Sequence, residues 1–119
     1  MGKKVLVVDD DEGILDALSL ILEESGYVVS ALASGDQTLN KTEQFKPDLI
    51  LLDVLMSGSD GRTICKLLKN QKRTKSIPII MISAHPGAAK GSLECGADDF
   101  IAKPFDSDDL LNKVERYIL

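Results

Sequence analysis

Five short apolar segments, each followed by a longer stretch of mixed polar and apolar residues, restrict the fold of this chain more than any other feature. The segments are VLVV (5–8), VVSAL (28–32), LILL (49–52), IIMI (79–82) and FIA (100–102). The first, third and fourth are continuous apolar runs, which are typical of parallel strands covered on both faces, because a half-exposed strand would alternate. Polar Ser30 in the second segment favours an edge strand.

The stretches between these segments predict helices. Apolar residues recur at helical spacing over residues 14–22, and Gly26 is a stop signal just beyond them. Two further helices are predicted after the N-cap candidates Asp60 and Asp106. The helical pattern is weaker over residues 35–45.

The weakest predicted helix covers residues 86–96. Pro86 is suited to open a helix, whereas Gly87, Gly91 and Gly96 lower its stability. Strand and helix therefore alternate five times, which predicts an α/β fold with one doubly wound, five-stranded parallel sheet and five helices. With no linker visible and a length typical of one domain, residues 1–119 are expected to form a single domain.

Composition narrows the function classes. The net charge of −5 argues against direct binding of nucleic acid, which rests on clustered Lys and Arg. No apolar run approaches the roughly 18 residues of a membrane span, and no signal peptide is visible. Cys65 and Cys95 lack metal-ligand spacing, so we expect reduced thiols in a cytoplasmic protein.

Polar residues follow four of the predicted strands at the point where each strand ends. They are Asp9, Asp10, Asp11 and Glu12 after the first strand, Asp53 after the third, Ser83 after the fourth and Lys103 after the fifth. Parallel strands place their carboxyl ends on one edge of the sheet, where open α/β sheets bind ligands. These side chains are therefore expected to share one site.

The chemistry of this edge favours a hard cation and phosphoryl transfer. Two like charges about 4 Å apart repel by roughly 4 kcal/mol at an effective dielectric near 20, so Asp9, Asp10 and Asp53 need a cation. Oxygen ligands select Mg²⁺, with Mn²⁺ as a substitute. Beside the metal, Asp53 can attack a phosphoryl group, while Lys103 balances charge and Ser83 donates a hydrogen bond.

Each residue also has a purely structural interpretation. The run DDDE (9–12) is compatible with a helix cap, Asp53 with a solvated strand end, and Lys103 with a surface lysine. Because all of them fall on the same edge, we favour the functional interpretation.

Four signatures carry a resemblance to a known family. They are VLVVDDDE (5–12), PDLILLDVLMSGSDG (47–61), IPIIMISA (77–84) and GADDFIAKPF (96–105). In this order and spacing, the chain resembles the receiver domains of bacterial two-component response regulators over essentially its whole length. The resemblance implies a flavodoxin-like sheet of strand order 2-1-3-4-5, which the chemotaxis member of this group also has.

The resemblance also implies roles for the acidic residues. Asp53 matches the phosphoacceptor. Asp10 matches a direct Mg²⁺ ligand, and Asp9 matches an acidic residue that acts through water. The backbone carbonyl of Leu55 would be a further ligand.

The remaining motif positions match residues that respond to the phosphoryl group. Ser83 matches the hydroxyl residue that contacts it, with small Ala84 beside it. Lys103 matches the lysine of the KPF motif, and its bond to Pro104 is expected to be cis. Phe100 occupies the aromatic switch position.

By the same resemblance, the chain is a signalling domain without independent substrate turnover. The implied donor is a histidine kinase or a histidine phosphotransfer protein. The implied output surface combines the fourth helix, the fifth strand and the fifth helix, and it binds an output domain or protein.

The chain departs from the family pattern in three places. Ser57 stands where many members have proline, which predicts a more mobile loop beside the acceptor. His85 and Pro86 are an uncommon pair after Ser83, and the fourth helix is glycine-rich. We hypothesise that Leu55 and His85 flank the phosphoryl group and that His85 is the main modulator of its lifetime, because apolar Leu55 cannot orient water.

Two other function classes remain as alternatives. A phosphatase of the haloacid dehalogenase type would use Asp9 as its nucleophile and leave Asp53 unexplained. A pseudo-receiver would have the same fold without phosphorylation, which the complete set of site residues disfavours.

Overall fold

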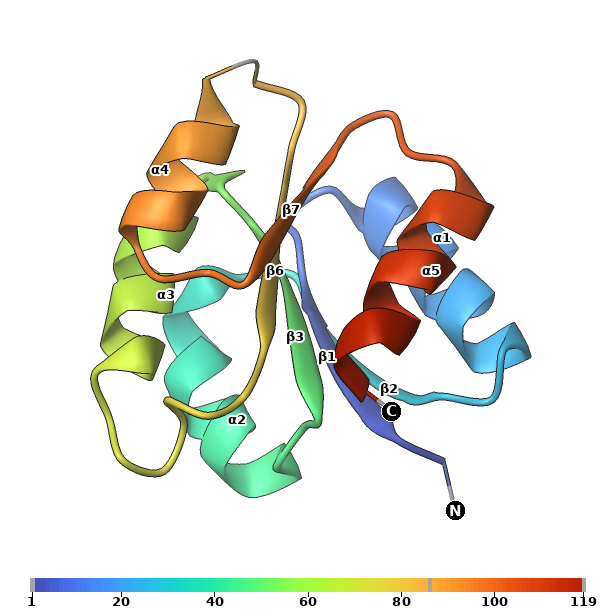
Figure 1. The fold of residues 1–119 in the computed structure, drawn as a ribbon, viewed down its shortest axis with the longest axis horizontal. Helices are drawn as coiled ribbons and strands as arrows, with labels where there is room; N and C mark the ends of the chain where they lie inside the picture. Colours follow the sequence, from blue (N-terminus) through green and yellow to red (C-terminus); the bar gives the residue numbers. More distant parts are fainter. Residues whose placement is uncertain (1, 86, 119) are drawn as a thin grey trace.

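The computed structural model describes residues 2–85 and 87–118, in which strands and helices alternate (Figure 1). The main strands are β1 (Lys4–Val8), β2 (Val28–Leu32), β3 (Leu49–Asp53), β6 (Ile79–Ser83) and β7 (Asp99–Ala102). The helices are α1 (Glu12–Glu24), the 3₁₀ helix η1 (Gly35–Gln37), α2 (Thr38–Phe45), α3 (Gly61–Lys69), α4 (Ala88–Glu94) and α5 (Ser107–Ile118). Among the described residues, no helix is long and apolar enough to cross a membrane.

The five main strands form one parallel sheet in the order β2-β1-β3-β6-β7. Since β6 and β7 are the fourth and fifth predicted strands, this confirms the doubly wound α/β sheet of order 2-1-3-4-5. Strand β2 lies at an edge and is only half-buried, as polar Ser30 predicted.

Helices cover both faces of the sheet, with α1 and α5 on one side and α2, α3 and α4 on the other (Figure 1). Successive residues of a strand point to opposite faces, so Val5 packs with α1 and α5 while Leu6 packs with α3 and α4. Every residue of β3 and β6 is buried. Burial on both faces explains why the central strands are continuous apolar runs.

Local polar contacts set the ends of the helices. The Asp11 carboxylate caps α1 by accepting hydrogen bonds from the N–H groups of Gly13 and Ile14. Asp60 caps α3 by accepting from the N–H of Arg62, and Asp106 accepts from the N–H of Asp108 at the start of α5. These contacts confirm the predicted caps of α3 and α5. They also show that part of the run DDDE does serve as a helix cap.

Three segments differ from the sequence prediction. The helix predicted over residues 35–45 is divided into η1 and α2. Helix α4 begins only at Ala88, whereas the predicted opening residue Pro86 lies outside the described residues. A small antiparallel hairpin, β4 (Leu55–Met56) and β5 (Ser59–Asp60), follows β3. Two-residue strands carry no periodicity, so the sequence pattern could not predict them.

Candidate functional site

The site lies at the carboxyl edge of the sheet, where four strands end side by side. Asp53 is the last residue of β3 and Ser83 the last of β6, while Asp9 and Lys103 follow β1 and β7 directly. Together with neighbouring residues they line a cleft of about 330 Å³. The lining residues are Asp9, Asp10, Asp11, Asp53, Leu55, Ser83, Ala84, His85 and Lys103.

Three carboxylates meet in this cleft. Asp9, Asp10 and Asp53 each offer an oxygen, and these oxygens all lie within 4.8 Å of one another. Asp9 and Asp53 are buried, with 1% and 4% of their surface exposed, whereas Asp10 is partly exposed. The sequence-predicted acidic residues therefore share one site.

Lys103 supplies the positive charge beside them. Its Nζ lies 2.9 Å from Oδ2 of Asp9 and 3.6 Å from Oδ1 of Asp53. The backbone N–H of Lys103 donates to the carbonyl of Ser83, which joins the ends of β6 and β7. The peptide bond between Lys103 and Pro104 is cis.

Burial and neighbouring charges shift the ionisation of these groups. Burial, followed by the negative charge of Asp9, raises the pKa of Asp53 from 3.8 to about 6, against the opposing effect of Lys103. Burial also works to lower the pKa of Lys103, but its contacts with Asp9 and Asp53 outweigh this effect and raise it. The lysine is therefore charged at neutral pH, and the Asp53 carboxylate carries an electrostatic cost that a bound cation would relieve.

The donor set fits a hard divalent cation. Three carboxylates at the ends of two adjacent strands can supply oxygen ligands to Mg²⁺, which is usually held by one or two carboxylates together with water and phosphate oxygens. Burial of Asp53, together with the negative charges of Asp9 and Asp10, raises its pKa, so a cation bound beside Asp53 would stabilise the ionised carboxylate.

The other predicted residues lie at different distances from this centre. Ser83 is buried, and its Oγ accepts a hydrogen bond of 3.0 Å from the N–H of His85. Leu55 and His85 are exposed and both line the cleft. Phe100 is half-buried on β7 and packs against the core on the α3 and α4 side, outside the cleft lining.

Sequence reasoning missed one residue that contacts the site. The backbone N–H of Ser57, in the turn of the β4–β5 hairpin, donates to Oδ2 of Asp10 at 2.8 Å. This contact holds the pKa of Asp10 below its ordinary value. The unusual serine was visible in the sequence, but a backbone hydrogen bond leaves no residue-type signal.

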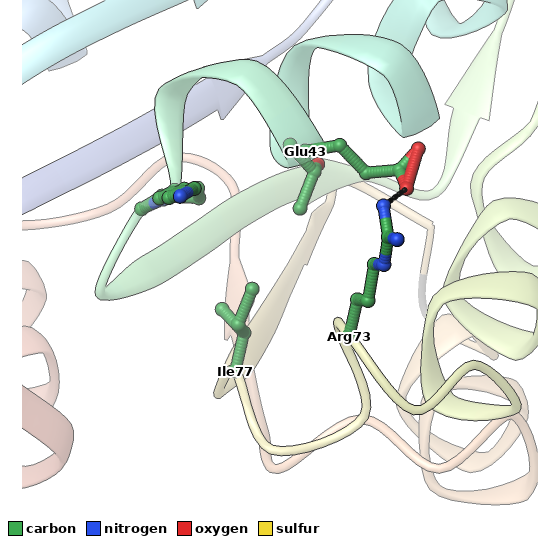
Figure 2. Close-up of a pocket in the computed structure, with 6 residues that line it drawn as sticks. Glu43, Arg73 and Ile77 are labelled. Carbon is green, nitrogen blue, oxygen red and sulfur yellow. Dashed lines mark ion pairs between the residues drawn. The ribbon is translucent and has the colours of Figure 1, made fainter.

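A larger hollow, of about 450 Å³, lies near the amino ends of β3 and β6, away from the carboxyl-edge site, and is a poor candidate for a catalytic site (Figure 2). Figure 2 shows Glu43 on α2 reaching across to Arg73, with 3.6 Å between Oε1 and Nη1, above Ile77. Arg73 is 83% exposed, and an ion pair in such a setting is worth at most about 1 kcal/mol. No cluster of acidic, thiol or imidazole groups is found at this hollow among the described residues.

Comparisons with known proteins agree with this geometry. The family described as the response regulator receiver domain matches residues 5–115. The chain is 46% identical over 107 residues to the alkaline phosphatase synthesis transcriptional regulatory protein PhoP of Bacillus subtilis, covering 88% of this chain and 44% of PhoP. The chain spans about half the length of the first curated relatives it matches.

Solved structures give the same result. The chemotaxis protein CheY4 of Vibrio cholerae superposes with a TM-score of 0.91 at 31% identity, over 98% of this chain and 99% of CheY4. The receiver domain of the sensor histidine kinase PA1611 from Pseudomonas aeruginosa superposes with a TM-score of 0.92 at 28% identity, over 99% of this chain and 98% of the PA1611 domain. That structure has a magnesium ion coordinated in its active site cleft. With this fold, this carboxyl-edge cluster and a family match over residues 5–115, the chain belongs to the receiver domains of two-component response regulators.

Proposed function

We propose that this domain accepts a phosphoryl group on Asp53 from a phosphohistidine donor, in a Mg²⁺-dependent reaction in the cytoplasm. The observation that carries the proposal is the position of the buried Asp53 carboxylate, which lies within 4.8 Å of carboxylate oxygens of Asp9 and Asp10 and 3.6 Å from the Lys103 ammonium group. A histidine kinase or a histidine phosphotransfer protein would be the donor. We further propose that residues 1–119 act as one domain without direct contact to nucleic acid.

Each residue has a defined task in this reaction. A carboxylate oxygen of Asp53 attacks phosphorus, an O–P bond forms, and the N–P bond to the donor imidazole breaks. Asp9, Asp10, Asp53 and the Leu55 carbonyl would hold the metal, with Asp9 acting through water. When bound, Mg²⁺ would neutralise charge on the phosphoryl oxygens. Lys103 is placed to exchange its contact with Asp53 for one with a phosphoryl oxygen.

The same contacts support a route from the site to the surface. Ser83 ends β6 and Lys103 directly follows the adjacent strand β7, and a backbone hydrogen bond of 3.0 Å joins the two residues. A phosphoryl group that attracts the Ser83 hydroxyl and the Lys103 ammonium would shift the ends of β6 and β7 together. Helix α4, of only seven residues, begins five residues after Ser83, and Phe100 lies on β7. We propose α4, β7 and α5 as the surface that an output partner reads.

Intact mass after incubation with acetyl phosphate and MgCl₂ tests the acceptor. Wild type should gain the mass of one phosphoryl group, and the Asp53→Asn variant should gain none. Asp16→Asn, which changes an exposed carboxylate on α1, should behave as wild type. A phosphoryl group found on Asp9 would indicate dehalogenase-type chemistry, and no modification of wild type with any donor would indicate a pseudo-receiver.

Amide hydrogen exchange with and without beryllofluoride, a phosphoryl mimic, tests the switch. We expect changed exchange in residues 83–105, because Ser83, α4, Phe100 and Lys103 all lie in this range. Unchanged exchange throughout this range would contradict the proposed output surface while leaving the acceptor chemistry intact.

A further inference from the structure

The β4–β5 hairpin reaches the acidic site through one hydrogen bond. The N–H of Ser57 donates to Oδ2 of Asp10 at 2.8 Å, across 47 residues of sequence. Ser57 is an exposed residue, and the group that contacts Asp10 is its backbone N–H in the turn. The N–H group of Ser57 makes the direct hydrogen bond and is the main cause of the lowered pKa of Asp10, to which the Ser57 hydroxyl adds a smaller effect.

The hairpin is held firmly enough for its turn to place this group. Leu55 pairs with Asp60 in the small sheet, and the N–H of Gly61 donates to the carbonyl of Val54 at 2.8 Å. On its outer side, the hydroxyl of Ser59 donates to Asp36 Oδ1 at 3.2 Å, which ties the hairpin to η1. Both ends of the turn that contains Ser57 are thus anchored.

Asp10 needs such a partner more than the other two carboxylates do. Lys103 forms its ion pairs with Asp9 and Asp53, which are both buried. Asp10 is partly exposed and faces two like charges, so repulsion favours its movement toward solvent. A hydrogen bond from a backbone N–H to an ionised carboxylate is stronger than one between neutral groups and opposes this movement.

We propose that the Ser57 N–H is a positioning group that holds Oδ2 of Asp10 and leaves the second oxygen of this carboxylate for the metal. The inference rests on the proposed Mg²⁺ site and adds a contact that receiver domains with proline at this position cannot make, because proline has no N–H. Partners that hold a metal ligand commonly change metal affinity when they are removed.

Two substitutions at one position separate the backbone group from the side chain. Ser57→Ala removes the hydroxyl and keeps the N–H, whereas Ser57→Pro removes both. The chain contains no tryptophan, so MgCl₂ binding is best followed by amide NMR titration or calorimetry. We expect Ser57→Ala to bind Mg²⁺ nearly as tightly as wild type and Ser57→Pro to bind about tenfold more weakly, while each metal-free protein still unfolds in one cooperative thermal transition.

The possible outcomes separate this inference from the proposed function. Equal Mg²⁺ affinity of Ser57→Pro and Ser57→Ala would overturn the positioning role alone. Failure of wild type to bind Mg²⁺ would overturn the metal site and the inference with it.

Amide exchange gives a second test that does not require the proline variant to fold. The Ser57 N–H of wild type should exchange slowly with and without MgCl₂, and Asp10→Ala should accelerate it. Fast exchange in wild type, or no effect of Asp10→Ala, would also overturn the positioning role.

Discussion

Nζ of Lys103 lies 2.9 Å from Oδ2 of Asp9, although 94 residues separate them in the sequence. The Lys103 side chain is 14% exposed and that of Asp9 is 1% exposed, so this ion pair is screened little by solvent. It joins the ends of two strands that have no direct pairing, because β3 and β6 lie between them. Lys103 is therefore a structural residue as well as a proposed participant in phosphoryl transfer.

Replacing Lys103 with methionine should destabilise the metal-free protein by about 3 kcal/mol, because it leaves two buried carboxylates without their cation. Urea denaturation at neutral pH with EDTA measures this change. Lys72→Met, at an exposed position, should change stability by less than about 0.5 kcal/mol. Addition of MgCl₂ should stabilise Lys103→Met more than wild type. Equal stability of the two lysine variants would contradict a structural role for the ion pair.

The raised pKa of Asp53 predicts an unusual pH dependence. The folded protein holds a proton on Asp53 up to about pH 6, whereas the unfolded chain loses it near 3.8. Between these values the folded state binds more protons, so the contribution of Asp53 to stability falls as pH rises from about 4 to 6. At about 1.4 kcal/mol for each pH unit between these two pKa values, the free energy of unfolding falls by about 3 kcal/mol between pH 4 and values above pH 6.

Asp53→Asn removes this effect because asparagine does not ionise. Without metal, we expect the variant to be more stable than wild type by about 2–3 kcal/mol at pH 7.5 and equally stable near pH 4. Denaturation curves of both proteins across this pH range measure the difference. Saturating MgCl₂ should reduce it at pH 7.5, since the cation relieves the charge in wild type only. A constant difference at all pH values would indicate that Asp53 is not perturbed.

Most of the fold was predictable because the strands are buried in a simple way. In β1, Val5 faces α1 and α5 while Leu6 faces the other helix layer, so both must be apolar and the run is continuous. The edge strand β2 is only half-buried, so it can contain the polar residue Ser30 and is not a continuous apolar run. The gathering of Asp9, Asp53 and Lys103 also followed from the sequence, since each comes at the carboxyl end of a parallel strand.

The features that the sequence did not predict depend on the backbone. The β4–β5 hairpin has two residues in each strand and is fixed by the contact of Ser59 with Asp36 and by the close approach of Gly61 to the end of β3. The hydrogen bond from Ser57 to Asp10 would form with any residue other than proline at that position. Helix α4 ends at Glu94, before the predicted end at residue 96, because Gly96, with φ of +93°, acts as a stop.

Gly61 is required for the close approach of the hairpin to the acceptor strand. A Cβ at this position would overlap the carbonyl oxygen of Asp53, which is backbone and cannot rotate away. Gly61→Ala should therefore destabilise the protein by about 2–3 kcal/mol and weaken Mg²⁺ binding, because the end of β3 must shift.

Gly87→Ala is the matched control, since no described atom other than its own and its neighbours' lies within 4 Å of a Cβ there. Thermal unfolding of both variants, followed by amide NMR titration with MgCl₂, measures the two effects. A Gly61→Ala variant as stable as Gly87→Ala would show that the hairpin can move away from Asp53 at little cost.

The rim of the cleft predicts how long a phosphoryl group would last on Asp53. Leu55 and His85 are exposed residues of the cleft lining, and the backbone N–H of His85 is fixed to Ser83 Oγ at 3.0 Å. Hydrolysis needs a water placed for attack on phosphorus, and an apolar leucine cannot orient one, whereas an imidazole can. His85→Ala should therefore lengthen the phosphoryl lifetime severalfold.

His85→Gln, which keeps a polar side chain, should give a lifetime between those of wild type and His85→Ala. Loss of phosphoryl mass after removal of the donor measures all three, with MgCl₂ held constant. The backbone contact with Ser83 does not depend on the side chain, so the substitutions are expected to leave the site geometry unchanged. Identical lifetimes would show that His85 is only an exposed loop residue, and control of hydrolysis would then rest with the loop of Leu55 and Ser57.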